Sequence, residues 1–183
     1  MSKITPSTFT TTIVSYSLVI IYIWRHGKAE TSSETGKDND RTLSPEGRNE
    51  VIDVADHVFG AKKMKKPEKI FSSPFLRAKE SAEMIQGFLA CEKGLEILPE
   101  LKAGTPFPEL VSALKSKAND LKSFALVGHV PDLESLAFCL LDGNPDQEIH
   151  LKTGGLVQIE VAELKEPFRG KLLFSVNPKN IGV

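Results

Sequence analysis

The sequence predicts an α/β fold of three layers, with helices on both faces of a mostly parallel central sheet of about six strands. Three observations predict it. Short apolar runs alternate about four times with segments in which apolar residues have helical spacing. The first run, residues 18–24 (LVIIYIW), is apolar throughout, as expected of a strand buried on both faces. Two more strand-like runs follow the last of these repeats.

The expected strands are short and rich in aliphatic and aromatic residues. They lie at residues 18–24, 69–72, 95–98, 123–127, 156–161 and 171–176. Polar residues 27–43, which include Gly36, predict a loop after the first strand. Helical segments fill the intervals between most of the other strands, and such crossovers are typical of parallel pairs.

Serine and proline residues mark the expected helix starts. The helices are expected to begin at Ser44–Pro45, at Ser73–Pro74, near Pro108 and after Pro131. Serine suits an N-cap and proline suits the first helical position. The lysine-rich residues 61–67 after the first helix are interpreted as a solvated helix end rather than a binding patch.

Composition narrows the class of protein. The chain of 183 residues suits one domain, and its 40% hydrophobic and 26% charged content is that of a soluble globular protein. A net charge of -1 provides no overall attraction to nucleic acid or to a membrane surface. Cys91 and Cys139 have neither CxxC nor metal-ligand spacing. We interpret both as buried free thiols, which fits a reducing, cytoplasmic location.

The N-terminal residues 1–16 are predicted to be a loose extension, and residues 17–183 a single domain. The apolar stretch at 13–24 is about 12 residues long, whereas a membrane-spanning helix needs about 20. Only Lys3 precedes this stretch, and no small-residue cleavage site follows it, which argues against a signal peptide.

Polar and charged residues follow the expected strands where each strand ends. In chain order they are Arg25, His26 and Gly27, then Arg77, then Glu100, and then His129. Ligands of open α/β sheets bind beyond the carboxyl ends of the strands. We therefore expect these residues to meet at one edge of the sheet.

Two arginines and two histidines in one crevice predict a site for an anion the size of phosphate. Guanidinium groups match phosphate oxygens, and unpaired cations in a crevice would repel one another. Arg77 is expected in the first turn of its helix, where a cation is unfavourable unless an anion lies nearby. Gly27 would allow the backbone to approach the ligand closely.

The histidines suit phosphoryl transfer. A neutral imidazole is a competent nucleophile toward phosphorus, and Arg25 is expected to lower the pKa of His26 and keep it neutral. His129 would then donate a hydrogen bond to a phosphate oxygen. No metal or other cofactor is required. Taken singly, each of these residues also has a structural interpretation: Arg77 as a surface ion-pair partner, His129 as a hydrogen-bonded core residue, and Glu100 as either a general acid or a carboxylate that orients an arginine.

Three motifs resemble the histidine phosphatase superfamily and its compact SixA-type phosphohistidine phosphatases. They are RHG at 25–27, SSPFLRA at 72–78 and GHVP at 128–131, with similar connecting stretches at 38–47, 97–101 and 153–161. The resemblance covers about residues 18–178 and implies a phosphoglycerate-mutase-like fold. It also implies a metal-independent phosphatase in which His26 becomes phosphorylated, with Arg25, Arg77 and His129 completing the phosphate pocket.

Two further residues keep two interpretations each under this resemblance. Arg41 matches an arginine that SixA-type members place near the phosphate, although it could equally form an ion pair with Asp38 or Asp40. Glu100 matches the proton donor of the superfamily's mutases and alkyl-phosphate phosphatases. A strong donor is less necessary for phosphohistidine, because imidazole is a better leaving group than an alkoxide.

The leading hypothesis is therefore a phosphatase acting on protein phosphohistidine. The short rim between Glu100 and His129 suggests an open pocket that admits a phosphorylated side chain of a folded protein. A phosphatase for small phosphate esters, with Glu100 as general acid, is the first alternative. A phospho-ligand-binding module without catalysis is the second.

Overall fold

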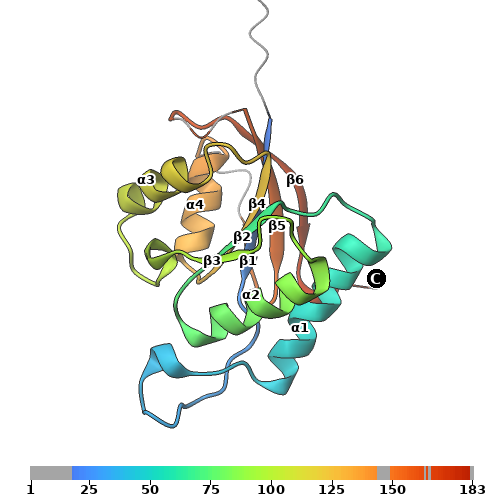
Figure 1. The fold of residues 1–183 in the computed structure, drawn as a ribbon, viewed down its shortest axis with the longest axis vertical. Helices are drawn as coiled ribbons and strands as arrows, with labels where there is room; N and C mark the ends of the chain where they lie inside the picture. Colours follow the sequence, from blue (N-terminus) through green and yellow to red (C-terminus); the bar gives the residue numbers. More distant parts are fainter. Residues whose placement is uncertain (1–17, 144–148, 163, 165, 182–183) are drawn as a thin grey trace, which may run out of the picture.

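A six-stranded sheet lies between two layers of helices in the computed structural model, which describes residues 18–143, 149–162, 164 and 166–181 (Figure 1). The strands are β1 (Val19–Arg25), β2 (Lys69–Ser72), β3 (Leu95–Ile97), β4 (Ser123–Gly128), β5 (Leu156–Val161) and β6 (Gly170–Val176). The helices are α1 (Pro45–Ala55), α2 (Leu76–Leu89), α3 (Phe107–Lys117) and α4 (Asp132–Leu140). The predicted extension at 1–16 lies outside the described residues.

The strand order is β3-β2-β4-β1-β5-β6. The first four of these neighbours run parallel to one another, whereas β5 is antiparallel to β1 and β6 is antiparallel to β5. The prediction of a mostly parallel, three-layer α/β fold is therefore confirmed. Parallel pairing places the carboxyl ends of β2, β4 and β1 side by side at one edge.

Each face of the sheet has its own apolar core. Helices α3 and α4 pack on one face, where Phe71 and Phe124 are fully buried, and α1 and α2 pack on the other, against Tyr22 and Trp24 (Figure 1). The unbroken apolar run from Val19 to Trp24 is thus explained, because both faces of this central strand are covered. Among the described residues, no helix is both long and apolar enough to cross a membrane.

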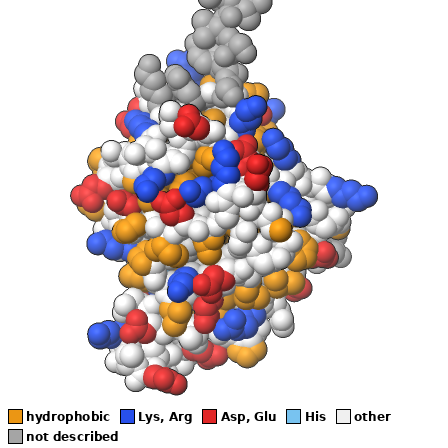
Figure 2. Space-filling model, in the orientation of Figure 1, with side chains coloured by type: hydrophobic (Ala, Val, Ile, Leu, Met, Phe, Trp, Pro, Cys, Tyr) orange, Lys and Arg blue, Asp and Glu red, His pale blue; other side chains and the backbone are white. Residues whose placement is uncertain are grey.

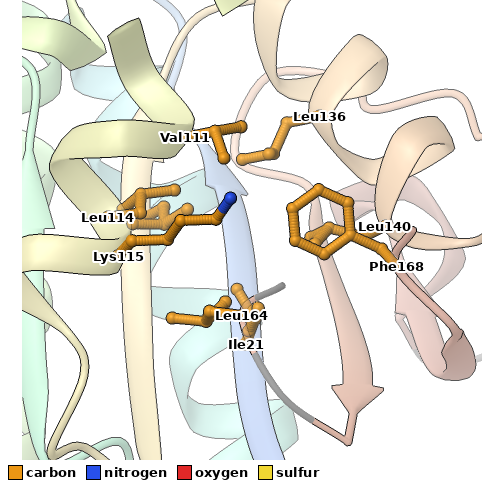
Figure 3. Close-up of a pocket in the computed structure, with 9 residues that line it drawn as sticks. Ile21, Val111, Leu114, Lys115, Leu136, Leu140, Leu164 and Phe168 are labelled. Carbon is orange, nitrogen blue, oxygen red and sulfur yellow. The ribbon is translucent and has the colours of Figure 1, made fainter. Parts of the chain in front are cut away.

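A small apolar hollow remains in the first core, between α3, α4 and the sheet (Figure 3). Leu114 and Leu136 line it together with Phe168, and its volume of about 10 Å³ is at the lower limit for one water molecule. This hollow is a packing defect rather than a ligand site. On the outer surface, positive and negative side chains are interspersed in the face that Figure 2 shows.

Local structure corrects two predictions. Helix α2 begins at Leu76 rather than at Ser73 and Pro74, because the backbone N–H of Ser73 still donates to the carbonyl of Val127 on β4 at 2.9 Å. Ser73 therefore continues the line of β2. Cys91 is buried as expected, but Cys139 is partly exposed.

Glycine is required where the chain leaves β1 and crosses the first turn of α1. Ser44 caps this helix, as predicted, by accepting a hydrogen bond from the N–H of Gly47 at 3.1 Å. A Cβ on Gly27 would lie 2.2 Å from the carbonyl oxygen of Gly47, and a Cβ on Gly47 would lie 2.0 Å from that of Lys28. Neither position has space for a side chain.

We expect Gly47→Ala to lower the free energy of unfolding by about 1–3 kcal/mol, because the added methyl group must displace backbone. Gly87→Ala is the matched control. Gly87 is an exposed residue of α2 with nothing within 4 Å of its missing Cβ, so this change should stabilise the protein by about 0.5–1 kcal/mol. Urea denaturation of both variants measures the difference, and equal effects would contradict the close approach.

Candidate active site

The parallel pairing of β1 with β4 brings the two histidines together. Arg25 at the end of β1 is in register with Gly128 at the end of β4, so His26 and His129 follow adjacent strand ends. Their ring centroids are 5.0 Å apart. Both residues are buried, with 8% and 4% of their surfaces exposed.

The tautomer of His26 follows from its hydrogen bonds. Its Nδ1 lies 2.7 Å from the carbonyl oxygen of Gly27. A carbonyl oxygen can only accept, so Nδ1 carries the proton and Nε2 carries the lone pair. The Nε–H of Arg77 donates to this Nε2 at 3.2 Å. The reactive lone pair of His26 is therefore directed toward the guanidinium group.

Both imidazoles have strongly lowered pKa values. Burial is the main cause for His26, and it lowers the pKa to about 4 with further lowering by the charges of Arg77, Arg25 and Arg41, while the Gly27 carbonyl opposes the change. Burial also lowers the pKa of His129 to about 3, assisted by His26 and Arg77. The prediction that the pKa of His26 is lowered is confirmed, but burial lowers it more than the charge of Arg25 does.

Arg77 is held by the chain's own carboxylate. It is the second residue of α2, and its two terminal nitrogens donate to Asp38, one to the backbone carbonyl at 2.7 Å and one to Oδ2 at 3.0 Å. Partial burial tends to raise the pKa of Asp38, but the hydrogen bond and charge of Arg77, together with Arg41, lower it overall. Arg77 is a cation in the first turn of a helix, where a nearby anion is expected. The carboxylate of Asp38 supplies part of that negative charge.

Arg25 and Arg41 border this cluster. Arg25 donates to the carbonyl of Leu151 at 2.8 Å, and its Nε is buried without a hydrogen-bond partner in the described part of the chain. Arg41 forms the ion pair with Asp38, at 2.8 Å, that its structural interpretation predicted. Its charge nevertheless lowers the pKa of His26, so it also contributes to the field of the site.

Glu100 is the predicted site residue for which the structure records no contact with the histidines in the described part of the chain. It lies in the short turn Pro99–Leu101 and lines a hollow beside α3 with Ser112 and Ser116. Its charge contributes to raising the pKa of Lys117, also on α3, after the larger effects of Glu96. Within the described residues, the buried Oε2 of Glu100 has no hydrogen-bond partner, and no ion pair links Glu100 to either histidine.

Sequence analysis missed two residues that contact the cluster. Ser73 Oγ lies 2.8 Å from His129 Nε2, and Asp38 binds Arg77 as described above. The position of Ser73, between a strand end and a proline, could have indicated that it lies at the sheet edge. The contact between Asp38 and Arg77 has no such signal in the sequence, because it depends on how the loop at 27–43 folds back. Gly27, a predicted site residue, contacts the site through its carbonyl oxygen, which lies 2.7 Å from His26 Nδ1.

Comparison with known proteins identifies a family that matches the part of the chain with most of these strand-end residues. The family model described as histidine phosphatase superfamily (branch 1) matches residues 21–103, which contain Arg25, His26 and Arg77. Phosphohistidine phosphatase SixA of Escherichia coli (strain K12) is 33% identical over 115 residues, covering 61% of this chain and 67% of that protein. An uncharacterized protein of Picosynechococcus sp. is 29% identical over 169 residues, covering 87% of this chain and 96% of the relative.

A solved structure has the same fold. The structure of the protein histidine phosphatase SixA complexed with tungstate superposes with a TM-score of 0.74 and 23% sequence identity, covering 88% of this chain and 99% of that chain. The strand-end residues, the family model and the sequence relatives agree. The chain belongs to the histidine phosphatase superfamily, among its SixA-type members.

Proposed function

We propose that the protein is a phosphatase that works through a covalent phosphohistidine on His26. The tautomer of His26 is the observation that carries this proposal. Its Nδ1–H donates to the Gly27 carbonyl, so the nucleophilic lone pair lies on Nε2, where it accepts only the Nε–H of Arg77 until a phosphoryl group takes over that donor. Nε2 attacks the phosphoryl group and the bond from phosphorus to the leaving group breaks. Water then attacks the phosphorus of phosphohistidine, releasing inorganic phosphate and restoring His26.

The other residues of the cluster stabilise charge on the phosphoryl oxygens. Arg77, Arg25 and Arg41 supply guanidinium groups near His26, and a guanidinium group matches the geometry of phosphate. His129 donates a hydrogen bond to an oxygen whose charge grows in the transition state. The phosphoryl group takes over Arg77 hydrogen bonds that His26 and Asp38 now accept.

Protein phosphohistidine is the substrate that this site fits best. The relative from Escherichia coli is named a phosphohistidine phosphatase. Hydrolysis of an alkyl phosphate needs a strong acid for its leaving group, and the orientation of Glu100 toward α3 argues against that role. A protonated imidazole leaves readily without such an acid. This position of Glu100 thus favours phosphohistidine over small phosphate esters.

We expect phosphate release from a histidine-phosphorylated phosphotransfer protein, in the presence of EDTA, to be faster than release from p-nitrophenyl phosphate or a phosphoserine peptide. His26→Ala should reduce this activity by at least about 1,000-fold, because the nucleophile is lost. His57→Ala is the control, since His57 lies in the helical turn Asp56–Ala61 away from the strand ends. Near-native turnover by His26→Ala would refute the mechanism, and preference for the esters would refute the substrate.

Glu100→Gln should leave kcat/KM for the phosphorylated protein within about 3-fold of wild type, because the imidazole of phosphohistidine leaves without a strong general acid. Arg77→Ala provides the contrast and should lower kcat by about 100- to 1,000-fold, the loss typical of one positioned donor. Steady-state kinetics on both variants measure the difference. A loss with Glu100→Gln as large as with Arg77→Ala would assign the acid role to Glu100.

The two histidines should stay neutral well below the ordinary histidine pKa of about 6.5. NMR titration should show that neither His26 nor His129 gains a proton between pH 7 and pH 5, given pKa values of about 4 and about 3. The unfolded chain binds these protons more readily, so stability is complete above about pH 6.5 and is lost as pH falls toward about 4, by up to about 1.4 kcal/mol per pH unit and histidine.

Comparison with His26→Asn isolates the contribution of His26 to this loss. Between pH 6.5 and pH 4.5, the free energy of unfolding of the variant should fall less steeply than that of wild type. Parallel curves, or a titration midpoint of His26 above pH 6, would show that the site holds a charged imidazole.

A further inference from the structure

Ser73 lies fully buried between β2 and α2, in contact with His129. Its surface exposure is 0%, and its backbone N–H donates to Val127 on β4, which fixes the residue beside the strand that leads to His129. Its Oγ accepts a hydrogen bond from the N–H of Phe75 at 3.3 Å and lies 2.8 Å from Nε2 of His129. The Ser73 hydroxyl thus accepts one hydrogen bond from the backbone and has one imidazole nitrogen within hydrogen-bond distance.

The hydrogen-bond inventory decides the direction of the Ser73–His129 bond. A hydroxyl has one proton to donate, and a buried donor left without an acceptor costs about 1–3 kcal/mol. Among the contacts of the described residues, Nε2 of His129 is the acceptor available to this proton. If Nε2 donated instead, both the Ser73 proton and the Nδ1 lone pair would lack a partner among the described residues, whereas donation by Ser73 leaves only the Nδ1–H unpaired. The Ser73 O–H therefore donates to Nε2, and a neutral His129 carries its own proton on Nδ1.

The Nδ1–H that results is a donor without a partner. His129 Nδ1 is buried and makes no hydrogen bond to any described residue, on a side chain of which 4% is exposed. The ring centroid is 5.0 Å from that of His26, so a phosphoryl group on His26 would lie within reach of this ring. The ring of Phe75, at 4.9 Å between centroids, packs against the imidazole and restricts its rotation.

We propose that Ser73 is a positioning residue that holds His129 as the Nδ1–H tautomer, and so turns its Nδ1–H into a fixed donor for a phosphoryl oxygen. Only one part of this inference rests on the proposed function, namely that the Nδ1–H of His129 donates to a phosphoryl oxygen of the substrate. The tautomer itself is a property of the free protein. It matters because a neutral imidazole has a single ring proton, which can serve Nε2 or Nδ1 but not both.

NMR of the wild-type protein labelled with 15N in histidine tests the tautomer directly, because protonated and unprotonated ring nitrogens have well separated shifts. At pH 7, His129 should show a protonated Nδ1 and an unprotonated Nε2. The opposite pattern would overturn the proposal without any variant. Assignment follows from the signals that disappear in His129→Gln.

Ser73→Ala is compared with Ser72→Ala in the same experiment. Ser72 is equally buried and adjacent, but its Oγ donates to the carbonyl of Ser73 instead of to a histidine. Ser73→Ala should shift His129 toward the Nε2–H form or a mixture of tautomers, whereas Ser72→Ala should leave its shifts unchanged. An unchanged tautomer in a folded Ser73→Ala variant would overturn the role of the hydroxyl.

Kinetics then connect the tautomer to turnover. Ser73→Ala should lower kcat for the histidine-phosphorylated protein by about 10- to 100-fold, with little change in KM, as losses of an orienting hydrogen bond typically do. In a His129→Gln background, Ser73→Ala should have no further effect, because both changes remove the same donor. Additive losses would overturn the proposal. An inactive wild type with the expected tautomer would refute the proposed function while leaving the Ser73–His129 assignment intact.

Discussion

The parallel pairing of β1 with β4 is the constraint on which the site depends. Arg25 and Gly128 are partners in this register, and a histidine follows each of them in the sequence. The two imidazole rings therefore meet just beyond the sheet edge. Both faces of β1 are covered by apolar cores, so a slip that moved β1 into the sheet would draw Arg25 into one of them. The charged residue that ends β1 therefore helps to keep His26 at the sheet edge.

Burial of a cation next to two imidazoles needs compensation, and the loop after β1 provides it. Arg77 is 6% exposed, yet Asp38 from that loop accepts two of its hydrogen bonds and also pairs with Arg41. Without a carboxylate there, the guanidinium charge would lie unpaired at a helix N-terminus, where the dipole opposes it. Asp38 thus balances the charge of the arginines while leaving Nε of Arg77 directed at His26.

The sheet edge could be predicted from sequence because periodicity locates strand ends, and strand ends locate His26, Arg77 and His129. Contacts between side chains that are far apart in the sequence could not be predicted in this way. Asp38 meets Arg77 through the conformation of a loop. Ser73 meets His129 because the chain stays beside β4 for one residue past the end of β2 instead of starting α2 there. The orientation of Glu100 depends on how its short turn packs on α3, which no local pattern encodes.

The cluster separates permanent charge from proton chemistry. Arginine side chains stay charged at any working pH, so they supply attraction for an anion that does not vary with conditions. The histidines are buried enough to be neutral, with pKa values of about 4 and about 3, so each offers one lone pair and one N–H. In each ring one hydrogen bond fixes the tautomer: the Gly27 carbonyl keeps the proton of His26 on Nδ1, and the Ser73 hydroxyl leaves the proton of His129 on Nδ1. The lone pair of His26 Nε2 accepts only the Nε–H of Arg77, a donor that a phosphoryl oxygen can take over, and the N–H of His129 has no partner among the described residues. Attack on a phosphoryl group requires this lone pair and this N–H together.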